Sequence, residues 1–489
     1  MIRPLIRQDW LLLRRDHTFA LVMLIGLLAV AYALYSNHQW AADKRAEFHQ
    51  ALELQVQQAQ VDRQRLQDLN SGILAISESP STGLPNTVSM EFLKAPGLLA
   101  ELSIGDSDLR PASASIKAMG RASDLFRYYQ VDNPELLAQG RFDLSFVVVY
   151  LMPLLILALT YSVLSTEAES GALQLLLSQP VSAARVAWTR IGLRTTLILS
   201  VVIGTSLVAW TIFANPPPND SSQPLLVSSS SNDVALRIAA YLVATAIYGG
   251  FWGCFAGAVA GANRSTQSNA LIMLLAWVLF TIVIPAIGSA AAQTLKPIPS
   301  RLEYTTTARD AENQANANGR ELLEGYLLDH PEIDATEKSA VAPFIKTFVL
   351  VQQRVDEAVA PIDQEFDRQL LGQQRLADQL AYFSPASLMQ KMLAELAGTS
   401  GARHLAYERQ AAELRQQWLT LLETPLIAGR RLTVEEFDAL PRPHFAVRPA
   451  AQVLATLIVP GLTLLAFALA VGFYGQRRLG RFRPGVLPQ

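Results

Sequence analysis

The sequence predicts a mainly α-helical, polytopic membrane protein with six transmembrane helices and a large, mostly helical extracytoplasmic domain. The 489-residue chain is 51% hydrophobic and only 17% charged, and its mean hydropathy is +0.23. Six largely uncharged apolar runs each approach the ~20 residues that a helix needs to cross a bilayer. Two long polar segments between these runs show helical periodicity, which predicts a folded domain outside the bilayer.

Hydropathy places the six predicted spans. They cover residues 18–36, 144–165, 193–214, 236–261, 269–292 and 449–474. The first run is interpreted as a span and not as a cleaved signal peptide, because it is long and no small-residue cleavage site stands out after Tyr35. The single cysteine, Cys254, lies inside an apolar run, so a large domain outside the cytoplasm would fold without intrachain disulfides.

The basic residues predict how the spans are oriented. Lys and Arg near span ends mark the cytoplasmic side, and the short segment 215–233 has neither. The other short segments and both tails are basic: Arg3, Arg7, Arg14, Arg15, Arg185, Arg190, Arg194, Arg264, Arg477, Arg478, Arg481 and Arg483. Both termini are therefore predicted to be cytoplasmic. Arg237, just inside the fourth span, is expected to extend toward the outer surface.

The chain accordingly divides into five parts. These are an N-terminal helix with the first span (1–36), a first extracytoplasmic part (37–143), spans two to five with a cytoplasmic loop at 165–192 (144–292), a second extracytoplasmic part (293–448), and the last span with a basic tail (449–489). Both extracytoplasmic parts emerge on one face of the membrane. We therefore expect them to fold together as one mainly helical unit.

Helical patterns fill much of the two extracytoplasmic parts. They are predicted at about 40–69, 341–381, 388–396 and 402–423. An apolar stripe of Phe48, Leu52 and Val56 needs a partner, and the second part offers Phe344, Phe348 and Val351. Arg403 and His404 are expected to form a surface pair.

The first fourteen residues predict an amphipathic helix at the membrane surface. One face carries Ile2, Ile6, Trp10 and Leu13, and another carries Arg3, Arg7 and Arg14. The apolar side chains suit the acyl boundary and the arginines suit anionic head groups, so the lipid bilayer is the expected partner. A frayed basic tail is the alternative.

A short motif follows the second predicted span. Its members are Glu167, Glu169, Gly171, Leu173, Leu176, Leu177, Ser178 and Pro180. The segment is too short to cross a bilayer, and it can form one or two helical turns with Leu173, Leu176 and Leu177 on one side. Such an apolar face beside a span suits docking of a soluble partner. An amphipathic turn at the membrane surface is the alternative.

This motif resembles that of permease subunits of ABC exporters of the ABC-2 type, in which the second span is followed by a pattern like E-x-E-x-G-x-L-x-x-L-L-S-x-P. Ser170 and Ala172 depart from the residues common there. Asn133-Pro134, Gly140-Arg141-Phe142-Asp143, Ser384-Pro385-Ala386 and Ala397-Gly398-Thr399 resemble a branch of that family with a large outer insertion of uncharacterised function.

The resemblance implies a permease subunit in a bacterial cytoplasmic (inner) membrane, coupled through the loop between spans two and three to two copies of a separate ABC ATPase. ATP and Mg would bind to that partner and not to this chain. A second permease chain, identical or related, would complete the transporter, and export would be the direction. The alternatives are a non-transporting ABC membrane subunit that transmits force to an extracytoplasmic partner, or a membrane receptor.

The fourth span and several missing motifs complete the prediction. Gly249, Gly253, Gly257 and Gly261 recur at one-turn steps, which allows close approach of a neighbouring helix, either as static packing or as a seam that moves during transport. No P-loop, H-E-x-x-H, Cys/His cluster or G-x-S-x-G motif occurs. The chain is therefore predicted to have no catalytic or metal site, and its net charge of −2 gives no reason to expect nucleic-acid binding.

Overall fold

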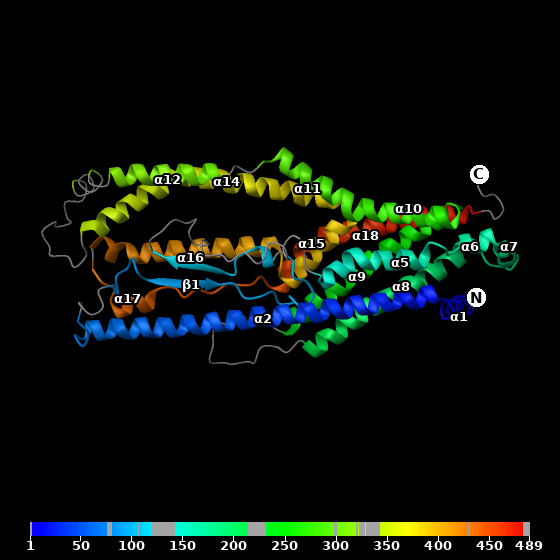
Figure 1. Cartoon of the computed structure of the whole chain (residues 1–489), viewed down its shortest axis with the longest axis horizontal. Helices are drawn as coiled ribbons and strands as arrows, with labels where there is room; N and C mark the ends of the chain where they lie inside the picture. The colour runs from blue at the N-terminus through cyan, green and yellow to red at the C-terminus, as the bar shows by residue number, and fades with distance from the viewer. Residues whose placement is uncertain are drawn as a thin grey trace.

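The computed structural model describes residues 2–75, 81–105, 107–118, 142–213, 231–297, 301–318, 321, 328, 343–428 and 430–482. Within these residues the chain is mostly helical, which confirms the predicted helical class. The molecule is elongated (Figure 1). A bundle of apolar helices forms one end, where α1 and the α6–α7 segment also lie. We call the described residues 37–118, 296–384 and 398–447, which form most of the other end, the distal domain.

The structure has six helices, counted over the described residues, that are long and apolar enough to cross a membrane. They are α2 (His17–Asn70), α4–α6 (Leu144–Glu169), α8 (Ala183–Phe213), α9 (Ser231–Ala260), α10–α11 (Thr266–Leu295) and α18 (Ala450–Gly480). All six predicted spans lie on these helices. The helix α8 begins ten residues before the predicted third span, so the end of the 165–192 loop is helical.

Two of these helices contain a π-helical turn directly before a proline. Val147–Leu151 precedes Pro153 at the start of α5 (Met152–Thr160), and Leu279–Val283 precedes Pro285 at the start of α11 (Ile284–Leu295). Proline has no N–H and its ring clashes with the carbonyl one turn back. The wider π-helical turn accommodates both defects, so the helices continue.

The first long helix is unbroken. The sequence suggests a span at 18–36 and a separate helix at 40–69, but α2 runs through all 54 residues from His17 to Asn70. It contains no proline, and Asp16 caps its start by accepting a hydrogen bond from the Thr18 N–H at 2.8 Å. At 1.5 Å per residue α2 is about 80 Å long. It extends from the apolar bundle to the far end of the distal domain (Figure 1).

The core of the distal domain contains side chains from both predicted extracytoplasmic parts. Leu66 of α2 and Met90, Phe92, Ala114 and Ile116 of the first part pack with the second part, which contributes Tyr407, Ala411, Leu414, Trp418 and Leu422 of α16 (Gly401–Ala428) and Phe437 of α17 (Val434–Ala439). Side chains of β1, β2 and the end of α2 therefore pack with α16, whereas the predicted stripe of Phe48, Leu52 and Val56 is not in this core, and Val56 is 40% exposed. Val351 belongs instead to a small cluster between α12 (Arg301–Ala317) and α14 (Pro343–Leu380), and the side chains of Phe344 and Phe348 lie outside the described residues.

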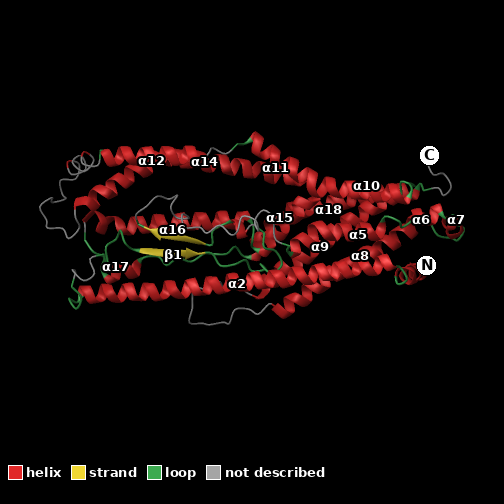
Figure 2. Ribbon diagram, in the orientation of Figure 1, coloured by secondary structure: helices red, strands yellow, loops and turns green. Residues whose placement is uncertain are grey.

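A two-stranded sheet, absent from the prediction, lies between α2 and α16 (Figure 2). Strands β1 (Ser89–Leu93) and β2 (Ser113–Lys117) pair antiparallel, with Phe92 opposite Ala114. Burial alternates along both strands, as expected when one face packs on a core. The Tyr407 ring stacks on Phe92 at 5.1 Å between centroids, and the Tyr407 hydroxyl donates to the Phe92 carbonyl at 2.6 Å.

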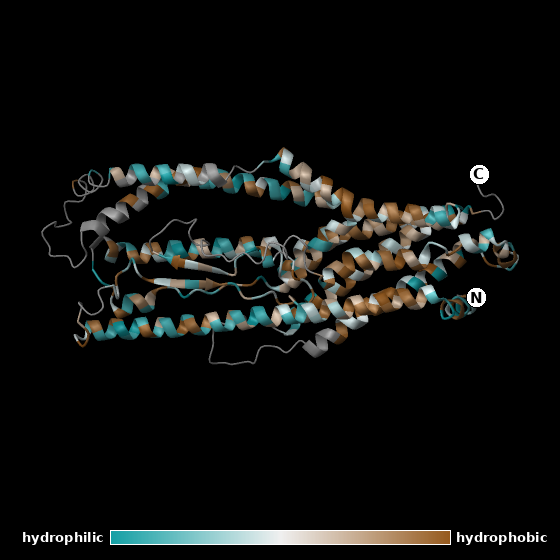
Figure 3. Ribbon diagram, viewed as in Figure 1, coloured by the Kyte–Doolittle hydropathy of each residue, from teal (hydrophilic) through white to brown (hydrophobic). Residues whose placement is uncertain are grey.

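One helix of the second polar segment belongs to the bundle. In α15 (Pro385–Ala397), Met389, Leu393 and Leu396 are buried among the bundle helices. Ser384 starts this helix: its hydroxyl accepts from the Ser387 N–H and donates to the Phe280 carbonyl at 2.6 Å. This helix packs on the bundle although it lies within the second predicted extracytoplasmic part, 293–448. Figure 3 shows mostly hydrophobic residues along the bundle helices and mostly hydrophilic residues along the helices of the other end.

Candidate functional site

The motif after the second predicted span forms two short helices at the end of the bundle. They are α6 (Ser165–Glu169) and α7 (Ala172–Leu177). Gly171 between them has a φ of +76°, in the left-handed region, while an added Cβ would have no atom within 4 Å. The backbone, and not the available space, therefore favours glycine at this position. Ser178 ends α7, with its hydroxyl donating to the Leu175 carbonyl at 2.7 Å, and Pro180 follows two residues later.

Glu167 is held by an arginine of the next helix. Both Arg190 terminal nitrogens donate to the Glu167 carboxylate, each at 2.8 Å, and Arg190 also donates to the Val163 carbonyl at 3.1 Å. Paired parallel hydrogen bonds of this kind are among the strongest and most directional ion pairs in proteins. The position of α6 is therefore coupled to the position of α8.

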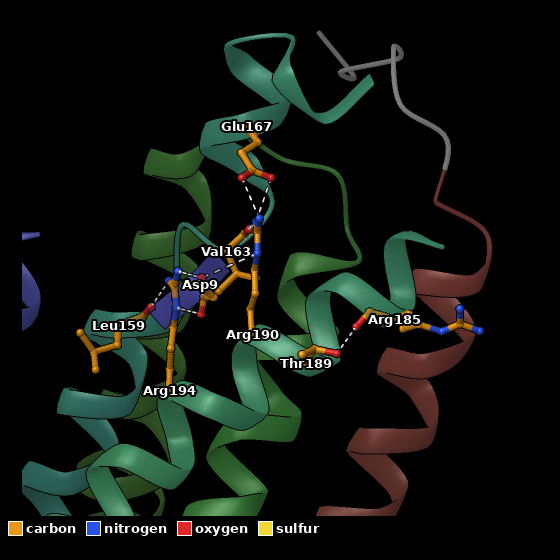
Figure 4. A network of polar contacts seen from close by, with 8 residues as sticks. All are labelled: Asp9, Leu159, Val163, Glu167, Arg185, Thr189, Arg190 and Arg194. Atoms are coloured by element: carbon orange, nitrogen blue, oxygen red, sulfur yellow. Dashed lines mark hydrogen bonds and ion pairs between the residues drawn. The ribbon is translucent and has the colours of Figure 1, made fainter. Parts of the chain in front are cut away.

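The same network includes the N-terminal helix (Figure 4). Asp9, on α1 (Ile2–Leu13), is 1% exposed and pairs with Arg194 at 2.9 Å and with Arg190 at 3.7 Å. Arg194 also donates to the Leu159 carbonyl at 2.6 Å. Two guanidinium groups balance two carboxylates, which is the arrangement that makes a buried charge cluster tolerable. We call Asp9, Glu167, Arg190 and Arg194 the charge cluster.

Glu169 makes a different connection. Its carboxylate accepts a hydrogen bond of 2.7 Å from the Thr266 N–H, at the start of α10, and the Thr266 hydroxyl donates to Ser165 at 2.8 Å. The first N–H groups of a helix have no intrahelical acceptor, and a negative charge there also stabilises the helix dipole. The two glutamates of α6 thus connect this short helix to α8 and α10.

The predicted apolar face of α7 is turned toward the chain's own bundle. Leu173 is fully buried in the chain's own core, and Leu176 and Leu177 pack against that core. These three were expected to form the docking face, but they hold α7 on the bundle. Leu175 is the most exposed leucine of α7, with 75% of its surface exposed, whereas Leu176 and Leu177 are partly buried. Helical spacing identifies the apolar face without showing whether the chain itself covers it.

The N-terminal helix also presents a different face than expected. Leu5, Asp9 and Leu13 are buried, whereas Ile6 and Trp10 are 38% and 37% exposed. Arg3, Arg7 and Arg14 are exposed, and the Ile2 side chain lies outside the described residues. Leu13 therefore belongs to the face that packs on the bundle. Ile6 and Trp10 remain on the face suited to lipid.

The four glycines that recur at one-turn steps, three on α9 and Gly261 directly after it, all lie close to neighbouring helices. A Cβ added at Gly249, Gly253 or Gly257 would lie 2.7, 2.9 or 2.5 Å from Leu199, Thr195 or Trp188 of α8, respectively. At Gly261 it would lie 2.9 Å from Arg478 of α18. These separations are below ordinary van der Waals contact, so α9 approaches α8 through Gly249, Gly253 and Gly257, and the turn after α9 approaches α18 at Gly261.

Arg237 does not extend outward as expected. It is 2% exposed and donates to the Arg448 carbonyl at 2.6 Å, and its guanidinium lies 3.6 Å from the Asp233 carboxylate. Arg403 and His404, expected at the surface, are also buried. Sequence reasoning missed the burial of these three because each also contacts a residue distant in the chain: Arg448 for Arg237, Ala95 for Arg403 and Lys94 for His404. No group of three His, Cys, Asp or Glu side chains in the described part could hold a metal ion.

His404 belongs to a hydrogen-bonded row of ionisable groups in the distal domain. The Lys94 Nζ lies 3.0 Å from His404 Nδ1, and His404 Nε2 lies 3.0 Å from the Glu408 carboxylate. Burial, together with repulsion from Arg403 and Arg110, lowers the pKa of Lys94 to about 7. Burial also lowers the pKa of His404. A neutral imidazole accepts from Lys94 and donates to Glu408, so the row is satisfied without a charge on the histidine.

Comparison with known proteins concerns the distal half of the chain. A family model described as "Domain of unknown function (DUF3526)" matches residues 301–446. That range begins with α12 and ends after α17, so the charge cluster and the α6–α7 segment lie outside it. No curated protein matches the chain.

Proposed function

We propose that this chain is the membrane-spanning permease subunit of an ATP-driven transporter of the ABC-2 type, with export as its direction. Two copies of a separate ATPase would dock at the α6–α7 end of the bundle, and a second permease chain would complete the complex. The ATP and Mg sites belong to those ATPase subunits. In this proposal the chain lies in a bacterial inner membrane, with α1, α6 and α7 on the cytoplasmic side and the distal domain outside.

The observation that carries this proposal is the charge cluster beneath α7. A force that a partner exerts on Leu175 would move α7 and also α6, because only Ser170 and Gly171 separate the two helices. The Glu167–Arg190 ion pair would transmit this motion to α8, and the Glu169–Thr266 hydrogen bond would transmit it to α10. Asp9 would connect the same guanidinium groups to α1, whose exposed Ile6 and Trp10 suit the lipid interface. Charged hydrogen bonds thus connect the α6–α7 segment and its network to α1, α8 and α10. Such connections suit a segment through which an ATPase moves the membrane helices.

A related function without transport has one specific observation in its favour. The unbroken helix α2 joins the bundle directly to the distal domain, so motion of the bundle would reach that domain without a flexible joint. A membrane subunit that acts on an extracytoplasmic partner would use the same coupling end. The two functions differ in their dependence on cargo: only a transporter moves a solute across sealed vesicles when ATP is supplied.

Site-specific photocrosslinking tests the docking proposal. A photoreactive amino acid at Leu175 in the native host should crosslink, on illumination, to a protein that carries a P-loop and binds a nucleotide photoprobe. The matched control is the same amino acid at Arg409, which is exposed on α16 in the distal domain and should not capture that protein. The proposal is wrong if position 175 captures no ATPase while the variant still inserts in the membrane.

A further inference from the structure

A small cavity lies where the distal domain meets the bundle. Three arginines line it: Arg237 of α9, Arg403 of α16 and Arg448 just before α18. Glu395 of α15 lines the same cavity, and Leu98, Phe445 and Val453 contribute apolar wall. Basic side chains from three separate parts of the chain thus converge on one enclosed space.

The donors of Arg237 are only partly used by the protein. Its Nη2 donates to the Arg448 carbonyl at 2.6 Å, and its Nη1 lies 3.4 Å from the Leu396 carbonyl. Its Nε is buried without a hydrogen-bond acceptor among the described residues, although the Asp233 carboxylate lies 3.6 Å away. A buried guanidinium N–H without an acceptor is costly, which favours an additional acceptor in this space.

Of the three arginines, Arg403 is the one without a nearby carboxylate among the described residues. It is 9% exposed, its Nη2 donates to the Ala95 carbonyl at 2.7 Å, and its guanidinium carbon lies 5.1 Å from the centre of the Phe445 ring. Within the described part of the chain it has no carboxylate at ion-pair distance, and its Nε has no acceptor. Burial and repulsion from Arg237 and Arg448 lower the pKa of Arg403 to about 10. The three guanidinium groups are therefore close enough to repel one another.

The described carboxylates near the cavity do not balance the charge of its three arginines. Glu395 lies 3.3 Å from Arg448, and Asp233 is the acid beside Arg237. Three guanidinium groups therefore face two carboxylates in a space closed on several sides by protein. An uncompensated charge in such a place is unfavourable, and a bound anion would compensate it while accepting hydrogen bonds from the unused donors.

We propose that this cavity binds a small anionic group, either a free oxyanion such as phosphate or the phosphate of an anionic lipid head group. Arginine suits both, because its planar donors match the oxygens of a phosphate or carboxylate. The anion would connect Arg403 of the distal domain with Arg237 and Arg448 beside the bundle, and so stiffen the junction between the two parts. This site is separate from the charge cluster and does not depend on the transport proposal.

Thermal unfolding of the purified full chain tests the site, because a ligand that binds only the folded state raises the melting temperature. In one arm the chain is kept in detergent, and sodium gluconate is replaced by sodium phosphate at constant ionic strength. In the other arm the chain is placed in nanodiscs, and phosphatidylcholine is replaced by phosphatidylglycerol. Stabilisation in the first arm identifies a free anion. Stabilisation in the second arm alone identifies a lipid head group.

Three variants decide whether either effect arises at this cavity. Arg403→Met should weaken the anion effect by about tenfold in half-saturating concentration, the loss expected for one charge-assisted contact of about 1.4 kcal/mol. Arg409→Met, on the exposed face of the same helix, should leave it unchanged. Glu395→Gln should strengthen it, because the carboxylate competes with the anion for Arg448.

The opposite signs expected for Arg403→Met and Glu395→Gln separate binding from general damage to the fold. If Arg403→Met itself unfolds the chain, Arg403→Lys and Glu395→Gln carry the test. The site does not exist if neither phosphate nor phosphatidylglycerol stabilises the wild-type chain. It is equally excluded if both effects persist unchanged in the Arg403 and Glu395 variants.

Discussion

Asp9 and Arg194 lie 185 positions apart in the sequence and form an ion pair of 2.9 Å, in which the aspartate is 1% exposed. This pair holds the short helix α1 on the bundle beside the α6–α7 segment. An amphipathic helix held only by lipid could slide or rotate. A buried carboxylate between two arginines restricts α1 to one register, with Ile6 and Trp10 facing away from the bundle.

Replacing Asp9 by Asn should therefore release α1. Two buried guanidinium groups would lose their shared counter-charge, at a cost of roughly 3 kcal/mol. Hydrogen exchange should become faster across residues 2–13, and the melting temperature in detergent should fall. Asp43→Asn is the control, because Asp43 is exposed. Unchanged exchange in α1 would mean that the ion pair does not hold this helix.

Leu175→Asp should weaken ATPase docking without harming the fold, because its side chain is largely exposed. A leucine that becomes buried against a partner contributes roughly 1.5–3 kcal/mol, so less ATPase should co-purify with the variant. Leu173→Asp places a charge in the chain's own core and should reduce the amount of folded protein. Equal co-purification of ATPase with wild type and Leu175→Asp would show that the tip of α7 is not the contact.

The glycines of α9 should tolerate large side chains very unequally. Gly257→Leu would drive a side chain into Trp188, and overpacking of this kind costs about 1–3 kcal/mol or more. Gly250→Leu is the matched control, because an added Cβ there has no atom within 4 Å. Ala258→Leu should also destabilise the chain, because Ala258 is buried against Gly475 of α18. Equal melting temperatures for the two leucine variants would contradict close packing of α9 on α8.

The buried Lys94 should make the stability of the distal domain depend on pH. Its pKa is lowered from 10.5 to about 7 in the folded chain. Between these values the unfolded chain binds more protons, so this group makes the free energy of unfolding rise as the pH increases from about 7 to about 10. Lys94→Met should flatten that rise, whereas Lys117→Met, on the exposed side of β2, should preserve it. Parallel curves for wild type and Lys94→Met would refute the expectation.

Cysteine labelling tests the proposed orientation. In a Cys254→Ala background, an impermeant thiol reagent applied to intact cells should label Gln57→Cys in the distal domain. It should not label Gln179→Cys beside α7 until the membrane is opened. Both glutamines are exposed in the structure, so accessibility within the fold does not bias the comparison. The reverse pattern would invert the proposed orientation. Most of the short segment without basic residues, 215–230, lies outside the described residues.

Sequence periodicity predicted the long helices well, because twenty apolar residues or a sustained helical stripe leave few alternatives. It did less well where a short element depends on distant partners. Asp9 looked like one polar residue in a basic tail, and its role depends on arginines about 180 positions later. Strands β1 and β2 have only five residues each in a segment interrupted by prolines, and α16, more than 280 positions on, covers their apolar face. The helix α2 joins two predicted helices because nothing between residues 36 and 40 breaks it.

The pairing of Phe92 with Tyr407 also determines the order in which the chain can fold during synthesis. The two residues are separated by 315 positions. At roughly 5–20 residues per second, a ribosome needs about 15–60 s to make the intervening chain. For that time Met90, Phe92 and Ile116 have no α16 to cover them. The nascent hairpin must therefore wait while several apolar helices are synthesised, and the core of the distal domain can close only when α16 has been made.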